Sequence, residues 1–440
     1  MTRPLHPKER PVFTRRAFLQ RAAAAGIALP TASAILAACG SGAQSSVATS
    51  GATTDTGQFG SGGVSGAPYP LARPNAPVTW NVDQSKVIAS NQEPEQNATI
   101  EMLRWPYYLA PSVIKSFEDK YHCHVNQTEF EDMDKGIKMM TAGESPFDVM
   151  IGMNVWALGK SIAAGLITPL NLDYIPNLAA NNWDTFQSPF YDVGSQYTVP
   201  YTVYKTGIGW RTDKVSEDIA KLENPWSIFW NAKKYTGYVG VLDDARESLS
   251  MAMLYRHFYD INTEDPQEID KALTDLKALI PICNPKINIT EYQTLATKQS
   301  WLHQSWSGDL LGAYVNYLPA GDDGSSLRFW AAPKGKGPIQ NDCWAVSATT
   351  TKPVLAHMFL NYILDQDVAF NNFAKFTGYQ PPQKSMTADA LIAKKIVPET
   401  LRTAVMGPED VGAGSLQECT LTSTGQKLWQ SAYAKFNSGT

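Results

Sequence analysis

The sequence predicts an α/β protein with two domains. Its 440 residues are enough for two domains at about 100 to 200 residues each. With 43% hydrophobic residues it can form a large core, and 18% charged residues is too low a fraction for a disordered chain. Segments with strand and helix patterns also alternate along the chain, which is typical of a sheet covered by helices.

The first set of elements begins near residue 98. The apolar pattern predicts a strand over 98–105, a helix that opens at Pro111, and a second strand over 124–130. A short apolar run over 147–151 is typical of a buried strand, and 156–166 suits a helix. This order predicts a lobe with a mostly parallel sheet.

A second set of elements follows. The pattern predicts a long strand over 197–210, a strand over 238–242 and a helix over 248–259. Asp265 then opens another helix, because a proline follows this capping residue and Glu268 lies three positions on. Neither set contains an internal repeat or a glycine-rich phosphate loop.

The N-terminal segment resembles an export signal. Arg15 and Arg16 precede a weakly apolar run over 22–38, and small residues then lead to Cys39. This arrangement resembles a twin-arginine signal joined to a bacterial lipoprotein cleavage site. A membrane anchor is the alternative, but the run falls short of about 20 strongly apolar residues. The resemblance implies removal of residues 1–38 and lipidation of Cys39, which would anchor the exported protein in the periplasm or at the outer face of the cytoplasmic membrane.

Residues 39–97 lack an apolar repeat. Glycine, serine, alanine and threonine dominate 40–67, which predicts a flexible tether behind the lipid. Residues 68–97 contain more proline and predict a lead-in that stays extended or wraps the surface of the folded part. We therefore expect the folded part to begin near residue 98.

The net charge of −5 is unevenly distributed. Residues 1–38 contain six basic residues and one acidic residue, a net charge of +5, so the remaining residues carry −10. This acidity disfavours nucleic acid and anionic lipid as partners and suits small cationic ligands. Tryptophan and tyrosine together number 31 against 16 phenylalanines, and such polar-tipped aromatics favour partly wet binding walls.

Three carboxylates are candidates for a binding site. Asp244 and Glu247 lie between a strand and a helix of the second set. Their spacing fits a helix start, where Asp244 caps the helix and both acids favour the positive end of its dipole. A site role is compatible with capping, because a helix N-terminus after a strand is the usual mouth of an α/β site. Asp342 precedes an apolar stretch and fits either a site or a turn.

Aromatic residues lie at several loop positions, where core packing is the alternative to a site role. Eight short segments also occur in a distinctive order at fairly even spacing. They are Trp105–Tyr108, Asp148–Gly152, Val199–Tyr201, Trp226–Trp230, Asp243–Glu247, Trp306–Gly308, Asp342 and Gly378–Pro382. In this order they resemble the bacterial spermidine/putrescine-binding proteins of ABC importers, over residues 98 to about 385.

The resemblance implies a two-lobed, type II periplasmic-binding-protein-like α/β fold with a ligand cleft between lobes that close on a hinge. It places lobe 1 at 98–204 and about 340–385, and lobe 2 at 205–339 and about 386–440. It also implies a polyamine ligand, an ABC permease with its ATPase as partners, a monomer, no cofactor and no enzymatic activity.

The resemblance further implies the ligand-binding residues. Trp105 and Tyr108 correspond to the aromatic wall of lobe 1, and Trp306 to a ring stacked on the methylene chain. Asp244 and Glu247 correspond to carboxylates that meet ligand nitrogens from lobe 2. The further cleft positions are Trp156, Asp342 and Tyr379. Such a set suits a polyamine, whose ammonium groups are separated by apolar methylenes.

Two positions depart from the family pattern. Tyr107 stands where spermidine binders often have an acid, and Gln340 stands where they often have a tryptophan. Each change removes one ligand contact and could favour a shorter diamine or another amine. Related clefts hold thiamine, phosphonates or ferric ion, although phosphonate would need basic residues where Asp244 and Glu247 stand.

Two other kinds of site are weaker alternatives. Paired acids could serve a glycosidase, but the chain has no cofactor fingerprint, nucleophile elbow or metal cluster. His122 and His124 could point to one face of a strand and bind a metal, but no third ligand is visible nearby. The sequence leaves the pairing of four cysteines open, namely Cys123, Cys283, Cys343 and Cys419.

Overall fold

The computed structural model describes residues 56–130, 133–142 and 147–439. The predicted signal over 1–38, the lipidation site Cys39 and the first part of the tether lie outside these residues. Within the described ranges, the chain forms no helix with the length and apolar character needed to span a membrane.

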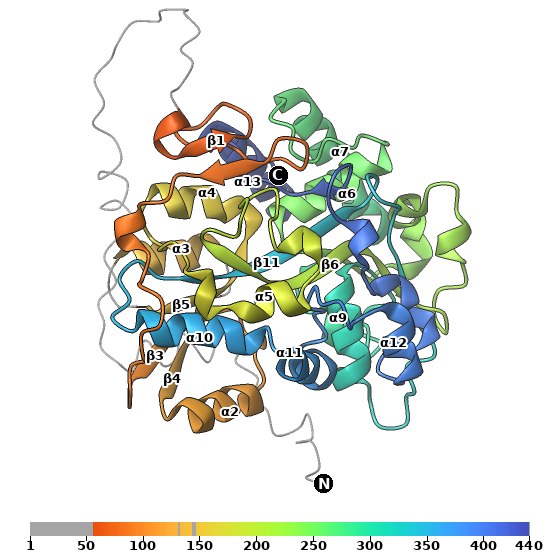
Figure 1. Ribbon diagram of the computed structural model, residues 1–440. Helices are drawn as coiled ribbons and strands as arrows, with labels where there is room; N and C mark the ends of the chain where they lie inside the picture. Colours follow the sequence, from red (N-terminus) through yellow and green to blue (C-terminus); the bar gives the residue numbers. More distant parts are fainter. Residues whose placement is uncertain (1–55, 131–132, 143–146, 440) are drawn as a thin grey trace, which may run out of the picture. The chain divides into compact units, whose positions relative to one another are not determined.

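Ten strands form one mixed sheet (Figure 1). Its order is β4-β3-β5-β11-β6-β9-β7-β8, with β10 beside β6 and β12 beside β11. A separate hairpin pairs β1 (Gly60–Gly62) with β2 (Val78–Trp80). The strands of the main sheet are β3 (Thr99–Arg104), β4 (His124–Glu129), β5 (Val149–Asn154), β6 (Thr198–Arg211), β7 (Val239–Leu242), β8 (Lys286–Asn288), β9 (Leu302–Trp306), β10 (Leu327–Trp330), β11 (Pro338–Val346) and β12 (Leu416–Gln417).

The sheet consists of two halves joined by crossing strands. Strands β4, β3 and β5 are parallel to one another, as are β8, β7 and β9. The fourteen-residue strand β6 pairs through residues 198–205 with β11, and through residues 206–211 with β9 and β10. Strand β11 is antiparallel to both β5 and β6, so the sheet is less parallel than the alternating pattern predicts. We call the β3–β5 half the first lobe and the β7–β9 half the second lobe.

Helices cover the sheet, which confirms the predicted α/β class (Figure 1). The α-helices are α2 (Pro111–Tyr121), α3 (Met133–Ala142), α4 (Val155–Ala163), α5 (Pro176–Asn181), α6 (Ala245–Tyr255), α7 (Pro266–Cys283), α8 (Glu291–Thr294), α9 (Ser307–Gly312), α10 (Pro353–Ile363), α11 (Gln366–Asn372), α12 (Ala388–Ala393) and α13 (Ser423–Asn437). Short 3₁₀ or π segments are Thr56–Gln58, Gln84–Lys86, Leu172–Tyr174, Asp184–Phe186, Ile219–Lys221, Pro225–Tyr235, Ala313–Tyr317, Phe373–Thr377, Glu399–Ala404 and Pro408–Asp410.

The predicted strands and helices between residues 98 and 283 are confirmed, with ends shifted by a few residues. Local signals explain this agreement. Asp265 caps α7 by accepting from the backbone N–H of Gln267, and Pro266 occupies the first helical position. Helix α2 likewise begins at Pro111, and it ends where His122 takes a left-handed conformation with φ 50°.

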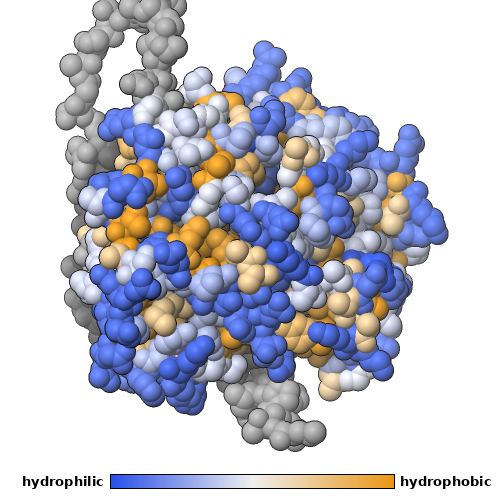
Figure 2. Space-filling model, in the orientation of Figure 1, coloured by the Kyte–Doolittle hydropathy of each residue, from blue (hydrophilic) through white to orange (hydrophobic). Residues whose placement is uncertain are grey.

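Each lobe has its own hydrophobic core. In the first lobe, Phe117 of α2 and Trp344 of β11 both pack against the ring of Phe359 of α10. Phe229 and Trp429 are buried in the second lobe, where the C-terminal helix α13 packs against α6 and α7. The face drawn in Figure 2 is mostly hydrophilic, as expected when the large apolar side chains fill these interiors.

The lead-in packs against the first lobe well before residue 98. Leu71, Val78 and Trp80 are buried, and the indole N–H of Trp80 donates to the backbone carbonyl of Tyr191 at 2.8 Å. The sequence pattern places the start of the folded part near residue 98. It misses the earlier residues because strands β1 and β2 have three residues each, which is too few to show a period. The structure shows that packed residues begin upstream of that boundary.

Replacing Gly152 of β5 with alanine should lower the free energy of unfolding by about 1–3 kcal/mol, because overpacking and backbone strain add. Gly152 has φ +82°, and a Cβ atom there would lie 2.1 Å from Cδ1 of Trp105. Urea unfolding measures the loss. Gly165→Ala is the matched control, since Gly165 also has positive φ but has open space around it. Equal losses in the two variants would show that the contact with Trp105 contributes nothing.

Candidate ligand-binding site

Two irregularities in the sheet lie beside Asp342 of β11. The pairing of β11 with β6 shifts register between Asp342 and Cys343, which leaves Tyr201 out of register on β6. The pairing of β11 with β5 shifts one residue later and leaves Gly152 out of register. Bulges commonly redirect side chains near functional sites. They occur here where the two crossing strands connect the lobes.

Asp342 is 1% exposed and accepts hydrogen bonds from four neutral donors. The hydroxyl of Tyr108 donates at 2.5 Å and the amide of Asn154 at 2.7 Å. The hydroxyls of Tyr204 and Thr202 lie at 3.3 and 3.5 Å. Burial raises the pKa of Asp342 to about 6, and these hydrogen bonds lower it in part. The structure therefore places a charge-bearing group where β11 pairs with β5 and β6, held by side chains from the β3–α2 connection, β5 and β6.

The neighbouring tyrosines remain protonated donors. Burial, and then the charge of Asp342, raise the pKa of Tyr108 and of Tyr204 well above the usual tyrosine value. The ring of Tyr379 lies 5.6 Å from that of Tyr108 and 5.3 Å from that of Tyr204. Gly308 makes room for Tyr379, because a Cβ atom there would lie 2.5 Å from the tyrosine ring. These three rings form an aromatic wall.

Glu247 is a buried carboxylate of α6 with one oxygen satisfied and one unpaired. Its Oε1 accepts from the indole N–H of Trp306 at 2.7 Å and from the hydroxyl of Thr206 at 2.8 Å. Its Oε2 is buried and has no hydrogen-bond partner. Burial, and then the charge of Asp244, raise the pKa of Glu247 to about 7. The ring of Trp306 also lies 6.3 Å from that of Tyr204, which joins this group to the aromatic wall.

The helix-start prediction for Asp244 is confirmed. Its carboxylate accepts from the backbone N–H groups of Arg246 and Glu247 at 2.8 and 3.0 Å, so Asp244 caps α6. Glu247 lies at the third helical position of the expected capping box, yet its carboxylate bonds Trp306 and Thr206. The helix start therefore carries two adjacent acids toward the crossing strands.

Glu418 lies near Glu247 and Asp244 and is not among the site residues predicted from the sequence. It is 5% exposed, and its Oε1 has no partner. Burial, and then the charge of Glu247, raise the pKa of Glu418 well above the usual glutamate value. The amide of Gln340 lowers that pKa in part, so the predicted site residue Gln340 lies beside Glu418. Glu418 follows the two-residue strand β12, which is too short to give a sequence signal.

A second carboxyl pair, Glu291 and Asp309, is also absent from the sequence-based set. Glu291 is 0% exposed and Asp309 7%, and Oε2 of Glu291 has no hydrogen-bond partner. Burial, and then the charge of Asp309, raise the pKa of Glu291 well above its usual value. Burial raises the pKa of Asp309 to about 6, and hydrogen bonds with Glu291 and from Tyr379 lower it in part, which places the pair at the aromatic wall. Asp309 lies three residues after Trp306, so a longer motif would have included it.

Two predicted tryptophans lie less centrally. The indole N–H of Trp105 donates to the carbonyl of Gly152 at 2.9 Å, and the ring of Trp105 packs 4.8 Å from that of Phe130. The ammonium of Lys160 lies 4.4 Å above the ring of Trp156. These two tryptophans therefore make these contacts with Gly152, Phe130 and Lys160, and not with the buried carboxylates.

Tyr107 is 48% exposed and adopts φ 59°. It is one of the groups that raise the pKa of Tyr292, after burial and the charge of Asp309. Tyr107 therefore extends from the first lobe toward the neighbourhood of the Glu291–Asp309 pair.

The described ranges contain no cluster of three histidine, cysteine or acidic side chains suited to a metal ion. His122 and His124 are exposed on either side of the buried Cys123. The four cysteines in the described part of the chain are buried and free, so none of them forms a disulfide.

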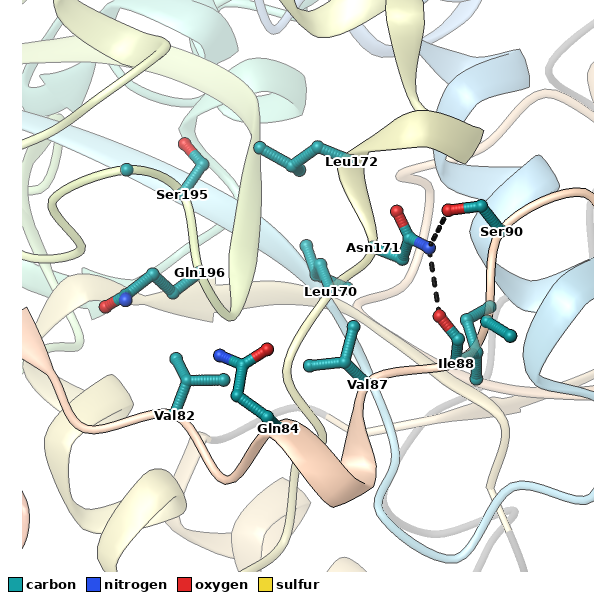
Figure 3. A pocket seen from close by; sticks show the side chains of 12 residues that line it. Val82, Gln84, Val87, Ile88, Ser90, Leu170, Asn171, Leu172, Ser195 and Gln196 are labelled. Atoms are coloured by element: carbon teal, nitrogen blue, oxygen red, sulfur yellow. Dashed lines mark hydrogen bonds between the residues drawn. The ribbon is translucent and has the colours of Figure 1, made fainter.

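A groove of about 460 Å³ lies apart from these acids, between the lead-in and the first lobe (Figure 3). One side is formed by residues 82–90, including Val87 and Ile88, and the other by residues 170–172 and 194–196. Asn171 donates from its amide to the carbonyl of Ile88 at 2.9 Å and so fastens the two sides together. All the residues that line the groove are uncharged, so it lacks the buried carboxylates described above.

A family model described as bacterial extracellular solute-binding protein matches residues 112–398. The spermidine/putrescine-binding periplasmic protein of Escherichia coli K12 is 26% identical over 73% of this chain and 89% of its own length. The norspermidine sensor of Vibrio cholerae is 27% identical over 64% of this chain and 74% of its own length.

A solved structure supports the fold. The spermidine/putrescine ABC transporter substrate-binding protein of Streptococcus pneumoniae superposes with a TM-score of 0.60 at 18% identity, covering 78% of this chain and 99% of that protein. This likeness confirms the two-lobed fold predicted from the sequence. Because the family model matches well over half of the chain, the protein belongs to the bacterial extracellular solute-binding proteins.

Proposed function

We propose that the protein is the solute-binding component of an ABC importer and that it captures a polyamine between its two lobes. The matched relatives carry names of polyamine-binding proteins. The charge of −10 outside the signal segment favours a cationic ligand in the same way. The proposed lobes are 98–204 with about 340–385, and 205–339 with about 386–440.

One observation carries the proposal: three buried carboxylate oxygens, which lie beside an aromatic wall, have no hydrogen-bond partner. They are Oε2 of Glu247, Oε2 of Glu291 and Oε1 of Glu418. A buried acceptor without a hydrogen bond costs about 1–3 kcal/mol, and more when it is charged. Ligand ammonium groups would satisfy these oxygens, while the rings of Trp306 and Tyr379 would pack against the methylenes between them.

Asp342 has a different role in this proposal. Its two oxygens already accept from four protein donors, so it orients Tyr108 and Tyr204 and adds negative potential to the cleft. Closure would bring the lobes together by bending at β6, which pairs with β11 through residues 198–205 and with β9 through residues 206–210. Gln340 and Tyr107, which replace two common ligand contacts of the family, would set the preference among amines.

The export features complete the proposal. Residues 1–38 would be removed as a twin-arginine lipoprotein signal, and Cys39 would carry the lipid. The mature monomer would then remain at the outer face of the cytoplasmic membrane or in the periplasm, without a cofactor or enzymatic activity, and deliver its ligand to a permease and its ATPase.

A thermal-shift panel tests the proposed ligand class. Spermidine, putrescine or spermine at a hundred times its Kd should stabilise the protein by about 2.7 kcal/mol and raise Tm by on the order of 5 °C. Thiamine, sugars and aminoethylphosphonate serve as comparison ligands in the same plate. A rise in Tm with sugars alone would refute the assignment of an amine ligand. A rise in Tm with thiamine alone would assign the site to a cation other than a polyamine.

A further inference from the structure

Four buried carboxyl groups of the cleft form two pairs without a cationic partner. Glu247 and Glu418 form the first pair, and Glu291 and Asp309 form the second. All four side chains belong to residues that are 7% exposed or less. Among the described residues, no lysine or arginine makes an ion pair with any of them. Each pair therefore concentrates negative charge in a place from which water is largely excluded.

The first pair faces one basic group, and that group is engaged elsewhere. Arg246 lowers the pKa of both Glu247 and Glu418. Its guanidinium, however, donates to the carbonyls of Ile261 and Cys419 at 2.9 and 3.2 Å. The other groups that face this pair are neutral or acidic: Thr206 and Tyr204 from β6, Trp306 from β9, Gln340 from β11, and Asp244 from the start of α6.

The second pair faces no cationic group among its described neighbours. The backbone N–H of Trp306 donates to Oε1 of Glu291 at 3.5 Å. The hydroxyl of Tyr379 bonds Asp309, and Tyr292 lies next to Glu291 with its own pKa raised by burial and then by Asp309. Two carboxylates in one buried place cannot both ionise at ordinary pH, and a proton shared between them lowers the repulsion.

We propose that each pair holds a proton while the cleft is empty and releases it to solvent when a ligand ammonium group enters, so that polyamine capture weakens as the external pH falls. This inference rests on the proposed polyamine-binding function. The proton balance is simple, because the ligand amines are protonated near pH 7 and stay protonated when bound. Each entering ammonium takes the place of one carboxyl proton, and that proton passes to water.

The linkage has a measurable size. Every proton released on binding changes the dissociation constant by about tenfold per pH unit in the range where the carboxyl is protonated in the empty protein only. With two pairs, we expect release on the order of one to two protons per bound spermidine at pH 7. The importer would thus load best in neutral or alkaline surroundings.

Calorimetric titration of the purified protein with spermidine tests this inference. Titrations at pH 7 in phosphate and in Tris, which have different ionisation enthalpies, should give different apparent binding enthalpies. The difference yields the number of protons released. A second series between pH 5.5 and 8 should show tighter binding at higher pH.

Two variants assign the protons to the pairs. Glu291→Gln and Glu418→Gln each leave one carboxyl in a pair, which can then ionise alone, so each should lower the release by about one proton. Glu223→Gln at an exposed position is the matched control and should leave the proton count unchanged. Release that stays the same in both pair variants would overturn the assignment to these pairs.

The failure of this inference differs from failure of the proposed function. Absence of binding heat with spermidine, putrescine and spermine throughout the pH series would refute the function itself. Binding with equal enthalpy in both buffers and a constant dissociation constant would leave the function intact and refute the proton coupling. The wild-type measurement alone decides this, even if a variant does not fold.

Discussion

Replacing Glu247 with glutamine should weaken spermidine binding by about 2–5 kcal/mol, which is roughly thirty- to several-thousand-fold in Kd. The change keeps the shape of the side chain, and the remaining carbonyl oxygen can still accept from Trp306 and Thr206. It removes the charge and the unpaired Oε2 that would meet a ligand ammonium. Calorimetric titration measures the loss, and urea unfolding shows whether the fold is kept.

Two neighbouring variants sharpen this result. Asp244→Asn should also weaken binding, yet leave stability nearly unchanged, since asparagine caps a helix about as well as aspartate. Asp243→Asn is the matched control, because Asp243 is exposed and accepts from the hydroxyl of Tyr433 at 2.7 Å. Full affinity in both Glu247→Gln and Asp244→Asn would place the ligand somewhere other than the start of α6.

Local signals allowed much of the fold to be predicted from sequence. Asp265 and Asp244 cap α7 and α6 as expected, because a cap depends only on residues within one turn. The long strand predicted over 197–210 forms as β6 (Thr198–Arg211), and almost every residue in it is buried. Its division between two halves of the sheet depends on partner residues that are at least 92 positions away along the chain, and no local pattern carries that information.

The candidate site was predicted less completely than the fold. Glu418 follows a two-residue strand and Glu291 opens a four-residue helix, so neither belongs to an element long enough to show a period. Their surroundings arise only when β12 pairs with β11 and α8 packs against α9. Trp105 illustrates the opposite case. Its position in sequence suits a ligand wall, but its indole N–H bonds the bulged Gly152.

The protein without ligand should become more stable as the pH is lowered from 8 to 6. Surface carboxylates that are paired in the folded state lower the stability only at more acidic pH, where they become protonated. Burial, and then Asp244, raise the pKa of Glu247 to about 7 from a usual value of 4.5. A raised pKa means that the folded state binds a proton which the unfolded chain does not hold in this range. The stability contributed by such a carboxyl is full below its unfolded pKa and is lost as the pH rises through its folded pKa.

The size of this effect follows from the number of groups. Each carboxyl that is protonated only in the folded state changes the free energy of unfolding by up to about 1.4 kcal/mol per pH unit. Glu418 and Glu291 share the direction of Glu247, because burial raises the pKa of both well above the usual value. We therefore expect a gain of several kcal/mol between pH 8 and 6, measured by urea unfolding without ligand.

Buried histidine works against this trend only at lower pH. Burial lowers the pKa of His303 to about 4 and also lowers the pKa of His357, both from a usual value of 6.5. The unfolded chain therefore takes up these protons first, and the two histidines lower stability mainly below pH 6.5. The slope between pH 8 and 6.5 therefore reports mainly the carboxyls. Glu291→Gln should reduce the dependence of the free energy of unfolding on pH by the contribution of the Glu291–Asp309 pair. Glu223→Gln, at an exposed position, should leave this dependence unchanged. A wild-type stability that rises with pH over this range would mean that these acids are ionised and compensated in the empty protein, and their unpaired oxygens would then no longer argue for an ammonium ligand.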